Sequence, residues 1–195
     1  MSNYRKIDVD PEKIFFTSDT HFSHKNVIEF CNRPFSSIDE MNEKIIENWN
    51  SVVTNDSLVF HLGDFAFSSN WHQFLDKLNG NVCLILGNHD IRDWRSSLEG
   101  LFTAVFREFD LMIDGQKIIL SHYPLFCWQG CNKTAGAVWN LHGHIHSGPF
   151  RGDNVDQDIF RYNQYKLPNQ YDCGVDNNDF TPISFPLLKK KLLNI

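Results

Sequence analysis

Short apolar runs recur along the first three quarters of the chain, and a polar cluster follows each of them. Runs of this length, rich in β-branched and aromatic residues, are typical of buried strands. They lie at 14–18, 58–62, 82–86, 118–121 and 138–142. The pattern therefore predicts a set of buried strands that each end in polar residues.

Two segments between these runs predict helices. Ser37 and Glu40 have the spacing of a capping box, in which the serine side chain accepts from the glutamate amide and the glutamate reaches back. A second apolar stripe predicts a helix over about 70–79, which Gly80 ends. The stripe behind the capping box is made by Ile38, Met41, Ile45, Trp49 and Val52.

The pattern changes in the later part of the chain. Segments 105–113 and 117–120 flank the Asp-Gly pair at 114–115, which predicts a β-hairpin. The polar stretch 150–166 predicts a loop, and 172–186 predicts short closing strands. Strand–helix alternation followed by hairpins indicates an α/β fold of mixed sheets with helices outside. No linker or repeat interrupts the pattern, so we expect one domain over residues 1–195.

Composition narrows the class of function. The 195 residues carry a formal net charge of −6 and include 17 Phe and 5 Trp, which is enough apolar content for a folded core. The short basic run 189–191 indicates a solvated end of the chain. An acidic protein binds phosphate backbones poorly, so we do not expect duplex nucleic acid as a partner.

Cysteine usage and hydropathy indicate the compartment. The five scattered cysteines form neither a disulfide framework nor a zinc motif. Residues 1–10 are polar and charged, and no apolar run is long enough to cross a membrane. We expect a soluble, cytoplasmic protein with free thiols. The sequence carries no signal of an oligomeric state.

The polar clusters supply the candidate chemistry. Sites in α/β sheets form beyond the carboxyl ends of strands, so clusters that are far apart in the sequence are expected to converge. Each cluster alone is weak, because Asp-x-His and Gly-Asp pairs also fill ordinary turns. In chain order the clusters are Asp19-Thr20-His21, Gly63-Asp64, Gly87-Asn88-His89-Asp90, His122 and Gly143-His144-Ile145-His146.

The order of all five clusters resembles that of the calcineurin-like metallophosphoesterase family. Its motifs are Asp-x-His, Gly-Asp, Gly-Asn-His-Asp/Glu, a single His and Gly-His-x-His, and all are present between about residues 15 and 147. Segments 19–24 and 30–35 look typical of the small single-domain bacterial and phage members. The resemblance implies an αββα sandwich of two mixed β-sheets, with a metal site at the C-terminal ends of the strands.

The resemblance also implies two divalent metal ions. The implied ligands are Asp19, His21 and His146 for one ion, Asn88, His122 and His144 for the other, and Asp64 as the bridge. Nitrogen and oxygen ligands without thiolate suit Mn, Fe, Zn, Ni or Co better than Mg, and Mn is favoured. A hydroxide that bridges the two ions would be the nucleophile.

The resemblance assigns His89 to the substrate and not to a metal. The histidine of this motif protonates the leaving oxygen in the family, which implies that His89 is the general acid. Asn88 and His89 would both contact the substrate. Asp90 is expected to complete the turn, and His61 and His142, inside strand runs, to be hydrogen-bonded core residues.

Other side chains keep two interpretations each. Arg33 is either a bidentate phosphate contact or part of a surface ion pair. His24 is either a substrate contact at the mouth of the site or a residue of a polar loop. Tyr123, Phe126 and Trp128 either stack on a base or aryl group or pack in the core.

The second cluster separates the chain from one branch of the family. Ser/Thr protein phosphatases carry Gly-Asp-x-x-Asp-Arg-Gly there, whereas Phe65, Ala66 and Phe67 follow Asp64 in this chain. We expect instead a phosphodiesterase acting on nucleotide-like or small phosphoester substrates. The alternatives are a small-molecule phosphomonoesterase and a non-catalytic scaffold, and the intact set of ligands disfavours the scaffold.

Overall fold

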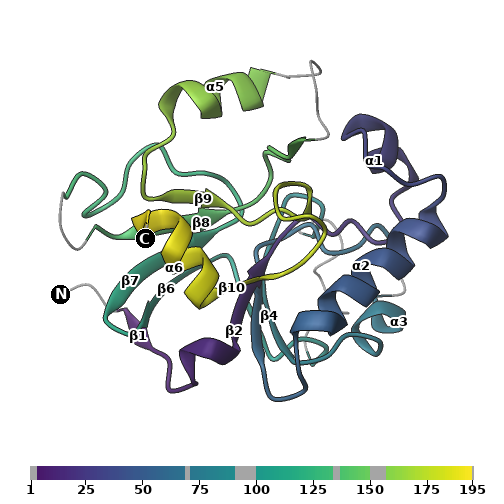
Figure 1. The fold of residues 1–195 in the computed structure, drawn as a ribbon, viewed down its shortest axis with the longest axis horizontal. Helices are drawn as coiled ribbons and strands as arrows, with labels where there is room; N and C mark the ends of the chain where they lie inside the picture. The colour runs from purple at the N-terminus through teal and green to yellow at the C-terminus, as the bar shows by residue number, and fades with distance from the viewer. Residues whose placement is uncertain (1–3, 69–70, 91–99, 134–136, 150–156, 195) are drawn as a thin grey trace.

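The computed structural model describes residues 4–68, 71–90, 100–133, 137–149 and 157–194. Their strands form two five-stranded sheets (Figure 1). In the first sheet the order β10-β2-β3-β4-β5 corresponds to Ile183–Ser184, Ile14–Thr17, Leu58–His61, Asn81–Ile85 and Ala104–Phe106. In the second the order β1-β6-β7-β8-β9 corresponds to Arg5–Lys6, Glu108–Ile113, Gln116–Ser121, Trp139–His142 and Gln170–Asp172. Both sheets mix parallel and antiparallel pairs, which confirms the predicted α/β fold.

The central strands of the first sheet are buried on both faces. Strands β2, β3 and β4 are parallel, with Phe15 paired to Val59 and Val59 to Val82. These three side chains face the helices, whereas Phe16 and Phe60 pack between the two sheets. Alternation with a period of two therefore divides each strand between two cores.

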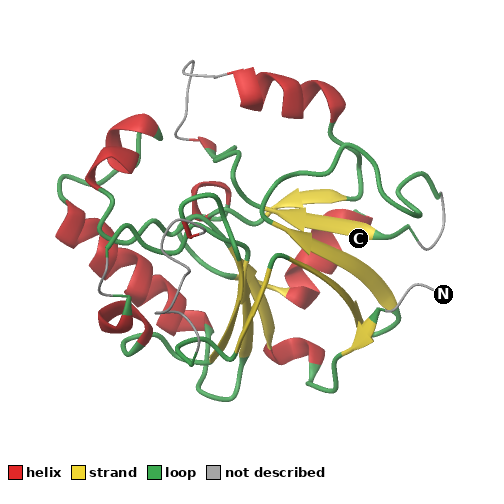
Figure 2. Ribbon diagram, turned by 180° about the vertical axis from the view of Figure 1, so that it is seen from behind, coloured by secondary structure: helices red, strands yellow, loops and turns green. Residues whose placement is uncertain are grey.

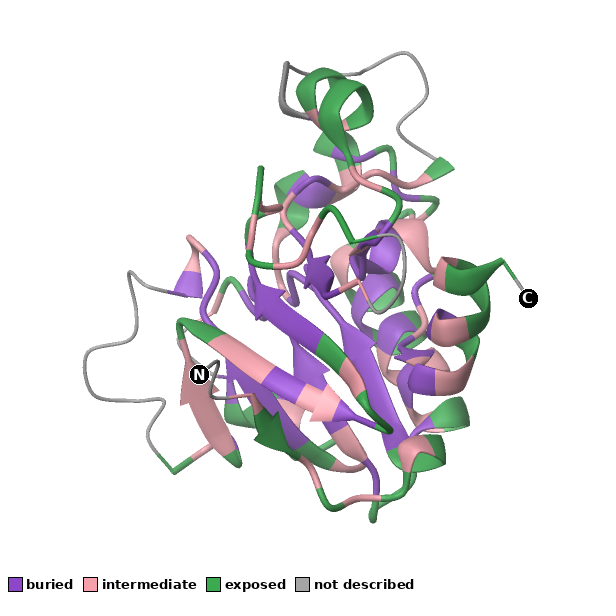
Figure 3. Cartoon of the chain, turned by 90° about the vertical axis from the view of Figure 1, so that its left-hand side faces the viewer, coloured by how far each residue is buried: buried purple, intermediate pink, exposed green. Residues whose placement is uncertain are grey.

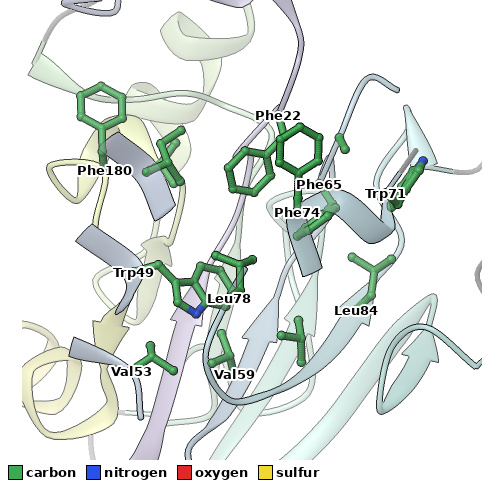
Figure 4. Close-up of a cluster of buried hydrophobic side chains, with 14 of the residues drawn as sticks. Phe22, Trp49, Val53, Val59, Phe65, Trp71, Phe74, Leu78, Leu84 and Phe180 are labelled. Carbon is green, nitrogen blue, oxygen red and sulfur yellow. The ribbon is translucent and has the colours of Figure 1, made fainter. Parts of the chain in front are cut away.

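Three helices cover the outer face of the first sheet: α1 (Lys25–Phe30), α2 (Ile38–Val52) and α3 (His72–Leu75). Figure 4 shows the core between them and the sheet, where Trp49 lies near Val59 and the Phe74 ring stacks on the Phe22 ring, 4.6 Å between centroids. This core holds the strands in place, so that the loops after them start from fixed points.

The predicted stripe of α2 is largely buried, through Met41, Ile45 and Trp49. The predicted capping residues interact in both directions. The Ser37 hydroxyl accepts from the Glu40 amide at 3.1 Å, and the Glu40 carboxylate accepts from the Ser36 amide and hydroxyl at 2.7 and 2.6 Å and interacts with the Ser37 backbone. The helix start is satisfied, because Ser37 caps the N3 amide.

The predicted hairpin forms, but the strand 105–113 does not exist as one element. Strand β5 pairs with β4 in the first sheet, and β6 pairs with β7 in the second. The chain crosses from one sheet to the other at Arg107. Both sheets bury apolar residues, so hydropathy alone could not reveal the crossing.

The prediction of a loop over 150–166 was wrong, because this stretch contains α5 (Gln157–Tyr165). Residues 150–156 lie outside the described residues. Apart from buried Ile159, the α5 side chains that the structure describes are exposed or half-buried (Figure 3). The helix is amphipathic, with Ile159, Tyr162 and Tyr165 at helical spacing, but the overall composition of the segment is polar, which favoured the loop prediction.

Two further segments differ in detail. The predicted helix 70–79 ends at Leu75, and the amides of Lys77 and Leu78 bond to carbonyls three residues back, in turns. Residue 70 lies outside the described residues. Segment 172–186 contains short strand β10, the 3-10 helix η3 (Val175–Asn177) and the start of α6 (Phe185–Leu193), which packs between the sheets. A short 3-10 helix, η1 (Pro11–Lys13), precedes β2.

Candidate metal centre

The loops that follow β2, β3, β4, β7 and β8 meet between the two sheets (Figure 2). Main-chain hydrogen bonds join them: the Asp19 amide donates to the Gly63 carbonyl at 2.9 Å, and the Gly143 amide donates to the His122 carbonyl at 3.0 Å. The five polar clusters of the sequence therefore lie together at strand ends, as the parallel arrangement requires.

One set of side chains, here called the first ligand group, consists of Asp19, His21 and His146. One donor atom from each lies within 4.8 Å of the others. The Nε2 atoms of His21 and His146 lie 3.9 and 3.8 Å from Asp19 Oδ1. These separations exceed a hydrogen bond and leave room for an ion at about 2.0–2.2 Å from each donor.

The second ligand group consists of Asn88, His122 and His144. Asn88 Oδ1 lies 3.0 Å from His122 Nε2, and Asp64, His122 and His144 again offer donors within 4.8 Å. Asp64 lies between the groups, with Oδ2 at 3.6 Å from both His21 Nε2 and His122 Nε2. One carboxylate oxygen thus faces both groups.

Two atoms of the first group show that the residues fit a cation. Asp19 Oδ1 and His21 Nε2 are buried and have no hydrogen-bond partner. An unsatisfied buried polar atom costs about 1–3 kcal/mol, and buried polar groups are normally paired. A divalent ion between these atoms would satisfy both.

The electrostatics of Asp19 and His21 point the same way. Burial raises the pKa of Asp19 to about 6, although His146 and His122 act in the opposite direction. Burial, together with His146 and Arg33, holds the pKa of His21 well below its usual value. A neutral imidazole keeps its lone pair for a metal, and a buried carboxylate needs a cationic neighbour to stay ionised.

The backbone at the site is strained. Positive φ angles of +49° to +71° occur at five of the seven predicted ligands, namely Asp19, His21, Asp64, His144 and His146. Such conformations are uncommon outside glycine and cluster at functional sites. At Gly63, with φ +105°, a Cβ atom would lie 2.5 Å from His122 Nδ1, so only glycine permits this close approach.

Asp90 does more than complete a turn. It is fully buried, and its carboxylate accepts from the amides of Asp64 at 2.8 Å, Phe65 at 3.1 Å and Gly87 at 2.8 Å. It therefore ties the loop after β3 to the loop after β4 and orients Asp64. The sequence signal was its place behind His89, but two of its three partners, Asp64 and Phe65, lie 26 and 25 residues away.

Arg33 is neither a phosphate contact nor part of a surface ion pair, the two roles predicted for it. Its guanidinium is buried, not on the surface, and binds Asp176 through Nε and Nη2 at 2.8 Å each. Nη2 also donates to the Asp19 carbonyl at 2.7 Å. The group is enclosed by these acceptors, so the predicted phosphate contact is corrected to a buried ion pair beneath the site.

Sequence reasoning missed Asp176. Its Oδ2 accepts from His146 Nδ1 at 2.7 Å, which leaves Nε2 of that ring to face Asp19. Burial alone would raise the pKa of Asp176, but Arg33 and His146 hold it below its usual value. Residue 176 follows none of the recognised strand ends, so no motif marked it.

The remaining histidines lie at three positions. His89 is partly exposed at the mouth, with Nε2 3.9 Å from Asp64 Oδ2, and its amide donates to Asp64 Oδ1 at 2.9 Å. His24 is half-buried there, with Nδ1 3.1 Å from His21 Nδ1. As predicted, His61 and His142 are buried and hydrogen-bonded, to Thr20 and to Tyr162 respectively.

Sequence comparison decides the family. A sequence model of calcineurin-like phosphoesterases matches residues 12–186, a span that includes every loop of the site. The chain belongs to the calcineurin-like phosphoesterase family. As a member of this family it is a hydrolase that acts on phosphoesters and uses divalent metal ions, and the two ligand groups are candidate positions for them.

Two proteins of similar length match the chain in sequence, and one solved structure matches it in fold. An uncharacterized protein of Methanocaldococcus jannaschii is 34% identical over 182 residues, which cover 91% of this chain and 90% of that protein. The gene 66 protein of Mycobacterium phage L5 is 29% identical over 162 residues, which cover 68% of this chain and 77% of that protein. A protein of unknown function from Aquifex aeolicus has a crystal structure that matches with a TM-score of 0.68, at 24% identity over 91% of this chain and 97% of that one.

In the described part of the chain, no helix combines the length and apolarity that crossing a membrane requires.

Proposed function

We propose that this phosphoesterase is a phosphodiesterase with a two-ion centre. Asp19, His21 and His146 would hold one ion, the second ligand group would hold the other, and Asp64 would bridge them. The observation that carries this proposal is the position of Asp64 Oδ2, 3.6 Å from an imidazole of each group. The two unpartnered atoms of the first group support it.

The donor set limits the chemistry of the ions. Imidazole, carboxylate and amide donors without thiolate suit Mn, Fe, Zn, Ni or Co, of which we favour Mn. When bound, a pair of such ions lowers the pKa of coordinated water and stabilises charge on the phosphate oxygens. Asp64 and Asp90 serve this chemistry by fixing the loops after β3 and β4 relative to each other.

His89 is the proposed general acid. Its ring is partly exposed and lies at the mouth of the site, 3.9 Å from the bridging carboxylate. From there Nε2 would donate a proton to the oxygen of the departing ester group, a contribution of about 10²–10⁴-fold. His24 lies beside it, with ring centroids 6.0 Å apart, and is a proposed substrate contact together with Asn88.

The charge around the site favours a diester over a monoester. A pocket of about 500 Å³ opens over the ligands, and none of the described residues that line it is Arg or Lys. Arg33, which lies beneath, is committed to Asp176. A phosphomonoester dianion is commonly bound with the help of such cations, whereas a diester carries one charge fewer.

A paired assay tests the proposal. Purified protein is loaded with Mn²⁺ and its turnover is measured on bis-p-nitrophenyl phosphate and on p-nitrophenyl phosphate. We expect a higher kcat/KM for the diester. A clear preference for the monoester would replace the diesterase by a phosphomonoesterase, and no turnover with Mn, Fe, Zn, Ni or Co would favour a scaffold.

We also propose a cytoplasmic location. The structure contains five free cysteines, of which Cys31, Cys83 and Cys173 are buried and Cys127 is exposed. Free thiols suit a reducing compartment. Labelling thiols in intact and lysed cells would check it.

A further inference from the structure

A second cavity, of about 590 Å³, adjoins the pocket over the metal centre. It lies between the loop after β7, the loop after β8 and helix α5, the helix at the top of Figure 1. Its size falls within the range of small-molecule sites, about 300–1,000 Å³. We call it the aromatic cavity, and the residues that matter below are Tyr123, Phe126, Tyr165, Arg161, Lys166 and His144.

The aromatic cavity is continuous with the metal centre. His144 and Ile145 line both the cavity and the pocket over the ligands. The Tyr123 ring lies 4.5 Å from the His144 ring, centroid to centroid, and its hydroxyl lies 3.5 Å from Asn88 Oδ1. A group attached to a phosphate at the metal centre could therefore extend directly into the cavity.

The walls present aromatic faces to solvent. Tyr123, Phe126 and Tyr165 are 49%, 80% and 56% exposed, and the rings of Phe126 and Tyr165 lie 6.2 Å apart at an angle of 67°. Single exposed apolar side chains are common on protein surfaces, but a contiguous group of them marks an interaction site or a ligand-binding groove. Aromatic rings of this kind stack on nucleobases.

The cavity also carries positive charge that the metal pocket lacks. Arg161 and Lys166 line it, and among the described residues neither forms an ion pair with a carboxylate. Arg161 lies on α5, and Lys166 follows the end of this helix. They are placed to meet a negative group separated from the phosphate at the metal centre.

Internal contacts hold the cavity in shape. The Tyr162 hydroxyl, whose pKa burial raises, lies 3.2 Å from His142 Nε2 and fixes α5 to β8. Across the cavity, the Leu125 amide donates to Asn140 Oδ1 at 3.0 Å, and Gln170 Nε2 donates to the Leu125 carbonyl at 2.8 Å. The site is thus preformed, which lowers the entropy lost on binding.

The position of His89 indicates which of the two ester groups of a phosphodiester would enter the aromatic cavity. The His89 ring neighbours His21, His24 and Phe67, whereas the cavity begins at Tyr123 beside the second ligand group. If His89 protonates the departing oxygen, the departing group leaves on its side. The cavity then receives the ester group that stays on the phosphate.

We propose that the aromatic cavity binds the retained ester group of the substrate, and that this group is a nucleoside bearing a further phosphate. Its base stacks among Tyr123, Phe126 and Tyr165, and its additional phosphate meets Arg161 and Lys166. This inference rests on the proposed phosphodiesterase function and names its substrate class, a nucleotidyl phosphodiester.

Three diesters with the same departing p-nitrophenol isolate the retained group. They are methyl p-nitrophenyl phosphate, the p-nitrophenyl ester of thymidine 5′-phosphate, and the same nucleoside ester with an added 3′-phosphate. With Mn²⁺-loaded protein we expect kcat/KM to rise at least about tenfold from methyl to nucleoside, as one stacked base permits, and to rise again with the 3′-phosphate.

Variants with matched controls locate the effect. Phe126→Ala and Tyr165→Ala should bring the nucleoside-to-methyl ratio of kcat/KM close to one, while Phe160→Ala, an exposed aromatic on α5 outside the cavity, should leave the ratio unchanged. Arg161→Gln and Lys166→Gln should remove the gain from the 3′-phosphate, and Lys190→Gln on α6 should not.

The outcomes separate this inference from the function on which it rests. Turnover of all three esters at equal efficiency would overturn the inference and leave the diesterase standing. A nucleoside preference that survives in Phe126→Ala and Tyr165→Ala would also overturn it, because the base would then bind elsewhere. No turnover of any ester with any of the five metals would overturn both.

Discussion

The two ligand groups of the metal centre are supported in different ways. In the first group, His146 donates to a buried carboxylate, Asp176, which in turn is held by Arg33. In the second group, His122 Nδ1 lies 2.8 Å from the main-chain carbonyl of Leu62. Charged side chains fix one group, and the backbone fixes the other.

The surroundings of the two groups differ as well. The first group contains two buried atoms without a hydrogen-bond partner, so its stability depends on a bound cation. The second group borders the aromatic cavity through His144 and Tyr123. The comparison suggests that the first group governs how tightly metal is held, and that the second lies next to the region that selects the substrate.

The largest effect on both ligand groups is expected from removing Asp64, the residue that they share. Asp64→Ala should lose both ions and reduce kcat by more than the roughly 10²–10⁴-fold expected for loss of a general acid, because Asp64 Oδ2 faces an imidazole on each side. Metal content by mass spectrometry and turnover on bis-p-nitrophenyl phosphate measure this. Asp76→Ala, at an exposed position, is the control. Retention of one full equivalent of metal would show that Asp64 serves one group only.

Removing His89 tests chemistry without disturbing either group. His89→Ala should bind metal normally but lose about 10²–10⁴-fold in kcat on an alkyl phosphodiester. The loss should be smaller on p-nitrophenyl esters, whose departing group needs no proton. His72→Ala, an exposed histidine on α3, should behave as the unmodified protein. Unchanged turnover of the alkyl diester would contradict the assigned role.

Asp176→Asn tests whether the two ligand groups bind their ions separately, because Asp176 contacts His146 of the first group and no described residue of the second. The neutral amide can no longer hold His146 and Arg33 by charge, so the ion of the first group should bind about 10–100-fold more weakly. The second ion should keep its affinity in a calorimetric Mn²⁺ titration. Asp179→Asn, three residues away and exposed, is the matched control. Equal weakening of both ions would mean that the groups do not act separately.

The smallest effect concerns the histidine beneath the first group. Burial lowers the pKa of His61 to about 3, whereas an unfolded chain protonates near 6.5. Between these values the unfolded state binds the proton and the folded state does not, so His61 destabilises the protein as pH falls.

His61→Gln should therefore make the free energy of unfolding fall less steeply with decreasing pH. The slope between pH 6 and pH 4 should change by up to about 1.4 kcal/mol per pH unit. Urea unfolding of metal-free protein at several pH values measures it. Parallel curves for the variant and the unmodified protein would show that His61 takes up its proton without unfolding.

The sequence by itself determined the residue types and their order along the chain. Apolar runs located β2, β3, β4, β7 and β8, and the polar residues behind them supplied every member of both ligand groups. This was possible because a buried strand has a local period and because sheet geometry brings strand ends together. The stripe of α2 was visible for the same reason.

Only the tertiary structure decided what lies behind those residues. Arg33 and Asp176 are 143 positions apart, and Asp90 binds amides of a different loop. The split between β5 and β6 was also invisible, and the polar composition of the segment hid α5, which walls the aromatic cavity. Local periodicity reports whether a residue is buried, but not which distant partner it meets, because that depends on how the two sheets pack.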